Sequence, residues 1–99
     1  MVYKVLITAR AEADFQRLLF ENADRYTPRE RLDYVEAIRT KCRGLDWFPK
    51  RSTPVTIKGL MYWRLTFKAH TVFYRVFDDE RVVEIEAVLH SAMDHTRRI

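Results

Sequence analysis

The first residues of the chain predict a strand that runs directly into a helix. Residues 2–8 are β-branched, aromatic or aliphatic, with one lysine and no turn-forming residue, which is typical of a strand. Both faces of this segment are mostly apolar, so we expect an internal strand of the sheet. From Ala9 the apolar positions recur every three or four residues. This spacing predicts an amphipathic helix with Thr8 as its N-cap and its end near Tyr26.

A second helix has a clear start signal. Thr27 suits an N-cap, Pro28 the first helical position, and Glu30 completes a capping box. The helix then carries one apolar stripe and ends near Gly44. The stripe consists of Leu32, Val35, Ile38, Cys42 and Leu45. Because few residues separate the two helices, we expect an antiparallel helical hairpin.

The second half of the chain predicts strands. Residues 46–59 contain two prolines and a glycine, which indicates an irregular connection with room for a short strand at 55–57. Three strands follow, at 61–67, 71–77 and 82–89, joined by turn-forming residues. Strict alternation in the last strand predicts one core-facing set, namely Val83, Ile85, Ala87 and Leu89.

The order of elements predicts an α+β fold. An N-terminal strand, an antiparallel helical hairpin and a three-stranded antiparallel meander should form one mainly antiparallel sheet, in the order β-α-α-β-β-β. The chain of 99 residues suits a single domain over residues 1–99. No apolar run approaches the roughly 20 residues of a membrane span, and no signal peptide precedes the first strand. We therefore expect a cytoplasmic protein.

The charge distribution and the missing cofactor motifs exclude few classes of function. The net charge is +4, and residues 47–77 hold six basic and no acidic side chains. Such a stretch favours an acidic protein or a polyanion as partner, although a solvated face accounts for it equally well. Cys42 lies on the apolar stripe, which favours a buried thiol. Glycine-rich phosphate loops and complete zinc ligand sets are missing from the sequence, so we expect no cofactor and no metal.

Two groups of residues carry candidate binding or catalytic chemistry. A metal-free ribonuclease could draw on His70, His90, Arg64 and Arg75, but spacing alone favours ordinary strand residues. The aromatic pairs Trp47-Phe48 and Tyr62-Trp63 adjoin basic residues. These rings could stack on nucleic-acid bases, pack in the core, or anchor a protein interface. A protein interface explains them at least as well as base stacking does.

Several segments resemble the ParE/RelE superfamily of bacterial toxin-antitoxin toxins. The resemblance spans nearly the whole chain and is carried by residues 5–15 (VLITARAEADF), 62–65 (YWRL), 70–76 (HTVFYRV) and 88–94 (VLHSAMD). The last segment is similar to the ParE branch in particular. The resemblance implies the β-α-α-β-β-β fold derived above and a type II toxin held inactive by a cognate antitoxin.

The two branches of this superfamily imply different chemistry. RelE-like members cleave messenger RNA on the ribosome, and the resemblance places two of their arginines at Thr71 and near Ala92, which are uncharged here. ParE-like members poison DNA gyrase and are neutralised by ParD-like antitoxins. ParE-like members also often carry arginine where Ala92 stands, a departure that bears on toxicity. We therefore expect a non-catalytic gyrase inhibitor, with a RelE-like endoribonuclease or a detoxified antitoxin-binding module as alternatives.

The site residues expected from this resemblance form two sets. An acidic or amphipathic antitoxin arm is expected on one apolar surface with two charge anchors, comprising Leu18, Tyr34, Trp47, Trp63, Arg64 and Arg75. By analogy with the family, gyrase binding and toxicity are expected in the C-terminal segment, at His90, Met93, Asp94, Arg97 and Arg98. No membrane and no sequence-specific nucleic acid is expected as a partner.

Overall fold

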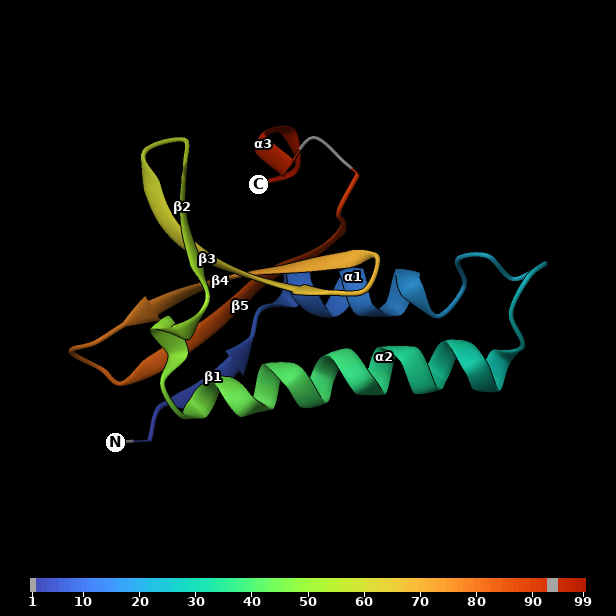
Figure 1. Cartoon of the computed structure of the whole chain (residues 1–99), viewed down its shortest axis with the longest axis horizontal. Coiled ribbons are helices and arrows are strands. Elements are labelled where there is room, and N and C mark those ends of the chain that lie inside the picture. The colour runs from blue at the N-terminus through green and yellow to red at the C-terminus, as the bar shows by residue number, and fades with distance from the viewer. Residues whose placement is uncertain (1, 93–94) are drawn as a thin grey trace.

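The chain folds around one five-stranded sheet. The computed structural model describes residues 2–92 and 95–99, without the side chains of residues 96 and 97. The elements are β1 (Lys4–Ile7), α1 (Ala9–Leu18), α2 (Pro28–Arg43), β2 (Thr53–Ile57), β3 (Leu60–Phe67), β4 (His70–Phe77), β5 (Val82–His90) and α3 (His95–Arg98) (Figure 1). The strand order is β1-β5-β4-β3-β2, with β1 parallel to β5 and every other pair antiparallel. The predicted α+β class is confirmed, and β2 adds the short strand before the meander.

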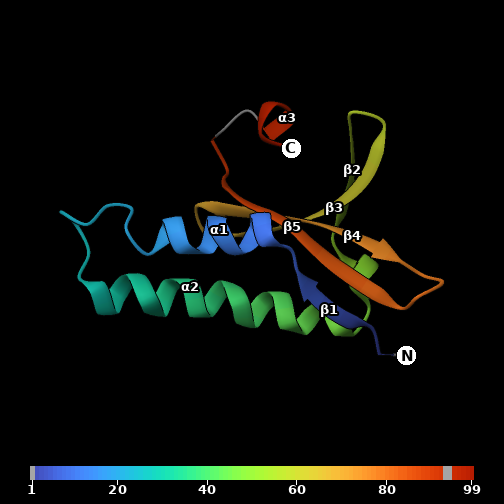
Figure 2. The ribbon, with the colours of Figure 1, turned by 180° about the vertical axis from the view of Figure 1, so that it is seen from behind.

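The helices divide the sheet into two faces. Antiparallel α1 and α2 lie side by side on one face, hereafter the helical face, whereas α3 lies on the opposite side, hereafter the open face (Figures 1 and 2). The main core fills the helical face and includes Phe15, Ile38 and Tyr74. A smaller cluster on the open face is built around Phe73 and Leu89, with Ile99 packed against it. The sheet is therefore apolar on both sides, although the two long helices α1 and α2 cover only one of them.

Both predicted helix starts are confirmed. The Thr8 hydroxyl accepts a hydrogen bond from the Ala11 amide at 3.1 Å, and the capping box of Thr27 and Glu30 is complete. The expected end of the first helix near Tyr26 is wrong, because α1 ends at Leu18. Turns fill the gap before α2, and Leu32 of the expected stripe is 40% exposed because it lies beyond the reach of the shorter α1.

The expectation that the first strand is internal is wrong. β1 is the edge strand beside β5, and its outer side makes only an isolated bridge between Val2 and Trp47 among the described residues. Its apolar pattern has another cause. Tyr3, Val5 and Ile7 pack against the helical-face core, whereas Leu6 on the other face is 39% exposed.

A β-bulge breaks the alternation predicted for the last strand. Phe73 pairs with Ala87 but Tyr74 pairs with Ile85, so Glu86 has no partner on β4. The extra residue reverses the direction of the side chains that follow it. Val83 and Ile85 face the helical-face core as expected, but Ala87 and Leu89 belong to the open-face cluster. The expectation of one shared face is therefore wrong.

Candidate functional site

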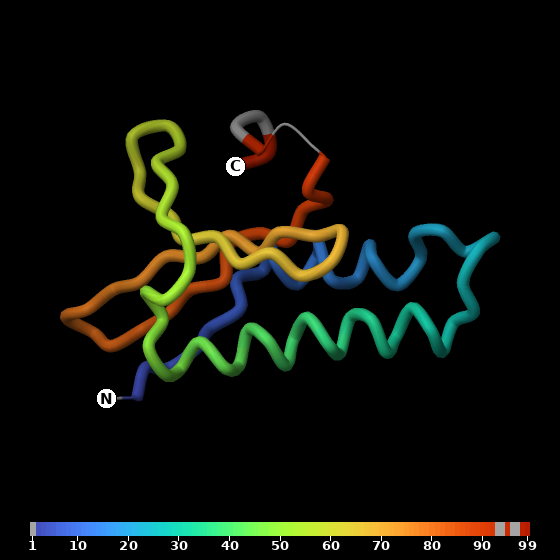
Figure 3. Tube along the Cα trace, in the orientation of Figure 1, coloured from blue at the N-terminus to red at the C-terminus, as the bar shows by residue number. Residues whose placement is uncertain are grey.

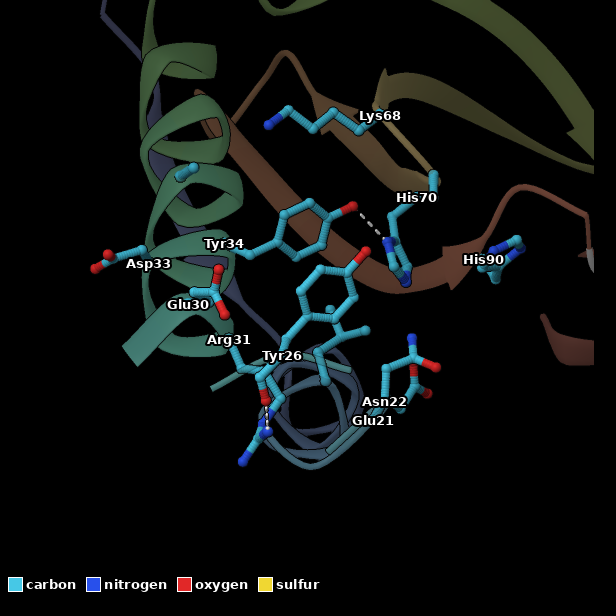
Figure 4. A pocket seen from close by; sticks show the side chains of 13 residues that line it. Glu21, Asn22, Tyr26, Glu30, Arg31, Asp33, Tyr34, Lys68, His70 and His90 are labelled. Atoms are coloured by element: carbon cyan, nitrogen blue, oxygen red, sulfur yellow. Dashed lines mark hydrogen bonds between the residues drawn. The ribbon is translucent and has the colours of Figure 1, made fainter. Parts of the chain in front are cut away.

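A pocket of about 550 Å³ lies at the loop end of the helical hairpin, where residues 19–27 connect α1 to α2 and the β3–β4 turn approaches. We call it the hairpin pocket (Figure 4). Aliphatic side chains of Leu18, Ala37 and Ala69 line it together with the rings of Tyr26, Tyr34, His70 and His90. Sequence reasoning missed Tyr26, because nothing in its local pattern indicates that the loop turns it toward β4.

His70 is the most buried polar side chain of this pocket. It is 8% exposed, and its Nδ1 lies 2.6 Å from the Tyr34 hydroxyl (Figure 4). Burial lowers the pKa of His70, so the imidazole is neutral at pH 7. Burial likewise raises the pKa of Tyr34. The other ring nitrogen of His70, Nε2, is buried and has no hydrogen-bond partner within the described part of the chain.

The rim of the hairpin pocket carries charges of both signs. The carboxylates of Glu21, Glu30 and Asp33 contribute to it, as do Arg31 and Lys68. The Arg31 guanidinium closes the connection between the helices, because it donates to the Leu19 carbonyl at 2.6 Å and to the Tyr26 carbonyl. Two donor nitrogens of Arg31, Nε and Nη1, are thus used within the protein.

The open face carries the two predicted charge anchors. Arg64 lies opposite Phe73 in the β3–β4 ladder, and Arg75 lies opposite Glu84 in the β4–β5 ladder. The ring of His95 packs edge-on against Phe73 with centroids 4.7 Å apart. Thr71 is buried on this face, and its hydroxyl lies 2.9 Å from the Ser91 hydroxyl. The open face is therefore uncharged at Thr71, near the start of β4.

An exposed aromatic pair lies beside the start of β1. Trp47 and Phe48 are 49% and 66% exposed, and their rings meet edge to face with centroids 4.9 Å apart. Phe48 has a φ of 50°, a left-handed conformation that costs a non-glycine residue about 1–2 kcal/mol. Val2, also exposed, bridges to Trp47. This apolar surface follows the C-terminal end of α2, whereas the hairpin pocket lies at the N-terminal end of that helix.

The residues of the expected antitoxin surface lie in four places. Leu18 and Tyr34 belong to the hairpin pocket, Arg64 and Arg75 to the open face, and Trp47 to the exposed aromatic pair. Trp63 packs against the helical-face core. The four apolar residues do not form one exposed surface, because Trp47 lies apart from the helical-face core that Leu18, Tyr34 and Trp63 share. Their role in antitoxin binding stays a prediction. Leu18 is only 5% exposed, because α1 packs on β5.

Two of the expected toxicity residues, His90 and Arg98, border hollows of the structure. His90 borders the hairpin pocket, and Arg98 borders a second hollow together with Arg10 and Arg17 of α1. Met93 and Asp94 lie outside the described residues, as does the side chain of Arg97. The structure thus brings Arg98 close to α1, a neighbour that the sequence did not indicate.

The four candidate ribonuclease groups do not form one centre. His70 and His90 lie on the helical side, with rings 5.4 Å apart, whereas Arg64 and Arg75 lie on the open face. Burial raises the pKa of Cys42 to about 12, so its thiol is not a nucleophile. Within residues 2–92 and 95–99, no group of His, Cys, Asp and Glu is arranged to hold a metal ion.

The sequence model of one protein family, described as ParE toxin of type II toxin-antitoxin system, parDE, matches residues 5–95. The chain belongs to the ParE toxin family. A search of curated protein sequences gives no significant match to this ParE-family chain. No helix in the described part of the chain has the length and apolarity needed to cross a bilayer.

Solved structures of toxin-antitoxin toxins share the fold of this ParE-family chain. A chain of the chromosomal ParDE system from P. aeruginosa aligns with a TM-score of 0.77 at 17% identity, covering 90% of this chain and 96% of that chain. A chain of the toxin-antitoxin complex RelBE2 from Mycobacterium tuberculosis gives 0.70 at 22% identity, covering 94% and 95%. A mutant of the E. coli toxin RelE in the free state gives 0.70 at 14% identity, covering 99% and 93%. These likenesses show the RelE/ParE-like fold and include both branches.

Proposed function

We propose that this protein is the toxin of a type II toxin-antitoxin pair, that it inhibits DNA gyrase without catalysing a reaction, and that a ParD-like antitoxin neutralises it. Membership of the ParE family over residues 5–95 supports the toxin assignment. The choice of gyrase over RNA depends on Thr71. The resemblance to RelE-like nucleases assigns a cation to this position, and here it is a buried hydroxyl bonded to Ser91.

The physical argument concerns the charge of the transition state. Metal-free cleavage of RNA needs cations beside the developing phosphorane charge, and each missing cation costs about 3–4 kcal/mol of stabilisation. Ala92, the second such position, is also uncharged. The separation of His70 from Arg64 and Arg75 by the sheet removes the other obvious catalytic group. These features support a toxin that inhibits its target by binding and does not cleave RNA.

One observation favours the RelE-like alternative. Arg64 lies opposite Phe73 in the sheet, and His95 packs on the same ring, so a guanidinium and an imidazole share one region of the open face. Such a pair could serve acid–base chemistry on RNA. The experiment below therefore measures translation as well as DNA damage.

The distribution of the apolar and charged surfaces supports a partner that wraps around the toxin. Arg64 and Arg75 lie on the open face, Trp47 lies beside β1, and Leu18 and Tyr34 line the hairpin pocket on the helical face. A disordered acidic arm that folds on binding reaches several surfaces of a small domain. The gyrase-facing segment remains the C-terminal one, with His90, Met93, Asp94, Arg97 and Arg98.

The decisive experiment is inducible expression of the full chain in bacteria, with a DNA-damage reporter and amino-acid incorporation followed in parallel. The proposal predicts growth arrest and filamentation with an early damage response while translation continues. Purified protein should also inhibit supercoiling by purified gyrase. Immediate loss of translation with cleaved messages would instead establish the nuclease alternative, and no arrest at all would identify a detoxified antitoxin-binding module.

A further inference from the structure

The second hollow of the structure, hereafter the arginine hollow, has a volume of about 410 Å³. Three guanidinium groups, of Arg10, Arg17 and Arg98, border it together with two carboxylates and the side chain of Leu89. Arg10 and Arg17 are about two helical turns apart on α1, so they lie on one side of that helix. Arg98 reaches the hollow from α3, at the other end of the chain. The fold thus brings cationic groups from two distant segments together.

The two carboxylates of the arginine hollow already have partners inside the protein. Asp14 is 5% exposed, and its two oxygens accept hydrogen bonds from the Arg17 guanidinium and from the Val88 amide, each at 2.9 Å. Glu21 accepts a hydrogen bond from Nε of Arg17 at 3.3 Å. Because Arg17 is held by two neighbouring carboxylates, these three side chains form an internally paired cluster.

The other two guanidiniums have no such partner in the described part of the chain. Arg10 and Arg98 are exposed, and neither makes a hydrogen bond or an ion pair within residues 2–92 and 95–99. Arg10 attracts Glu86 through space but forms no ion pair with it. A guanidinium has five donors, and its planar fork matches two oxygens of an anion. With three guanidiniums against two carboxylates, the arginine hollow is positive and has donors to offer.

We propose that the arginine hollow binds a phosphate group of a DNA backbone. Arg10 and Arg98 donate hydrogen bonds to the oxygens of this phosphate, and the contact is independent of the base sequence. A duplex carries a negative charge about every 1.7 Å along its axis, so a phosphate is within reach in any register. The net charge of +4 adds to the attraction. The proposal rests on the proposed function only in naming DNA, because DNA gyrase holds duplex DNA close to any toxin that binds it.

The test measures binding of the isolated full chain to a fluorescein-labelled duplex of about 20 base pairs by fluorescence anisotropy. We expect Arg10→Gln and Arg98→Gln each to weaken binding about three- to tenfold at about 0.1 M salt. Each should also lower the slope of log K against log salt by about 1, the change expected for one lost phosphate contact. The matched control is Arg25→Gln, which removes the same charge from the exposed loop between α1 and α2 and should weaken binding less than about twofold.

Three results would overturn the proposal. An equal loss in Arg25→Gln would mean that net charge alone attracts DNA. Absence of binding up to about 100 µM protein at about 50 mM salt would exclude DNA as the ligand. Tighter binding of poly-glutamate of equal charge would identify an acidic protein segment instead. Thermal unfolding of each variant confirms that the fold is retained.

The outcome is independent of the toxin proposal. Because no gyrase, antitoxin or cell takes part, failure of DNA binding leaves the toxin proposal standing. Failure of the expression experiment likewise leaves phosphate binding in the arginine hollow standing.

Discussion

Glu86 combines a bulged backbone, partial burial and a neighbouring carboxylate. It is the unpaired residue of β5, and its Oε2 is buried with no partner among the described residues. Burial, and then the hydrogen bond and charge of Glu84, raise its pKa to about 7 from an ordinary value of 4.5. Arg75 and Arg10 oppose this shift. Between these pH values the folded chain binds more protons than the unfolded chain, so stability falls as the pH rises through this window.

Replacing Glu86 with glutamine should therefore stabilise the protein in a pH-dependent way. Because the side chain is partly solvated, we expect Glu86→Gln to raise the free energy of unfolding by about 1 kcal/mol at pH 8 and by much less at pH 4.5. Urea denaturation at the two pH values measures the difference. The matched control is Glu80→Gln, in the exposed turn, which should show no such dependence. A gain that is equal at both pH values would contradict the assignment.

At the scale of elements, β5 has two different neighbours along one side. Its first half pairs with β1, from Val82 to Ile85, and its second half borders α1. Asp14 of α1 is 5% exposed, and its Oδ2 accepts a hydrogen bond from the Val88 amide at 2.9 Å. Thr8 donates to the Ile85 carbonyl at 2.9 Å where β1 ends. Helix α1 thus replaces a strand and satisfies an edge that would otherwise be open.

Removing the carboxylate of Asp14 should leave this edge unsatisfied. Asp14→Ala buries an unpaired Val88 N–H and takes a partner from Arg17, so we expect a loss of about 2 kcal/mol in the free energy of unfolding. Asp14→Asn keeps an acceptor oxygen and should lose less than half as much. Urea denaturation and hydrogen exchange of the Val88 amide measure both effects. Asp24→Ala, at an exposed loop position, is the control, and an equal loss in the alanine and asparagine variants would argue against the hydrogen bond.

At the scale of the whole molecule, the helical hairpin extends beyond the sheet and gives a long shape of 44 × 28 × 22 Å (Figure 3). The hairpin pocket occupies the extended end, whereas Trp47 and Phe48 lie beside β1. Helix α3 approaches two other parts at once, because Arg98 borders a hollow with α1 and Ile99 packs on the open-face cluster. A partner at the C-terminal segment therefore meets α1 and the open face together.

Charge reversal at Arg98 tests whether this region mediates toxicity. Arg98 is exposed, so Arg98→Glu should leave the fold intact. The substitution places a negative charge beside the positive charges of Arg10 and Arg17 in the same hollow. We expect at least about a tenfold weaker inhibition of gyrase supercoiling, which corresponds to about 1.4 kcal/mol. Lys4→Glu is the control, since Lys4 is exposed on edge strand β1, away from α3 (Figure 1). Equal potency of the two variants would remove Arg98 from the target interface.

The accuracy of the sequence-based predictions followed the range of the interactions concerned. The capping box at Thr27 and the strands of the meander are encoded by neighbouring residues and were predicted within one residue at most boundaries. The faces of Ala87 and Leu89 were mispredicted because the bulge at Glu86 depends on pairing with β4. Among the expected site residues, Leu18, Tyr34 and His90 were brought together in one pocket, although they were expected in two different sites.

The sequence by itself determined the α+β class, the order of the elements, both helix starts and the burial of Cys42, since apolar spacing and capping are local properties. The resemblance of short segments determined the family. Only the tertiary structure decided that β1 is an edge strand, that the expected antitoxin residues occupy separate surfaces, and that His70 lies unpaired in a pocket. These features depend on which strands become neighbours and on where a connecting loop folds back. Such contacts join residues far apart in the chain, and no local pattern encodes them.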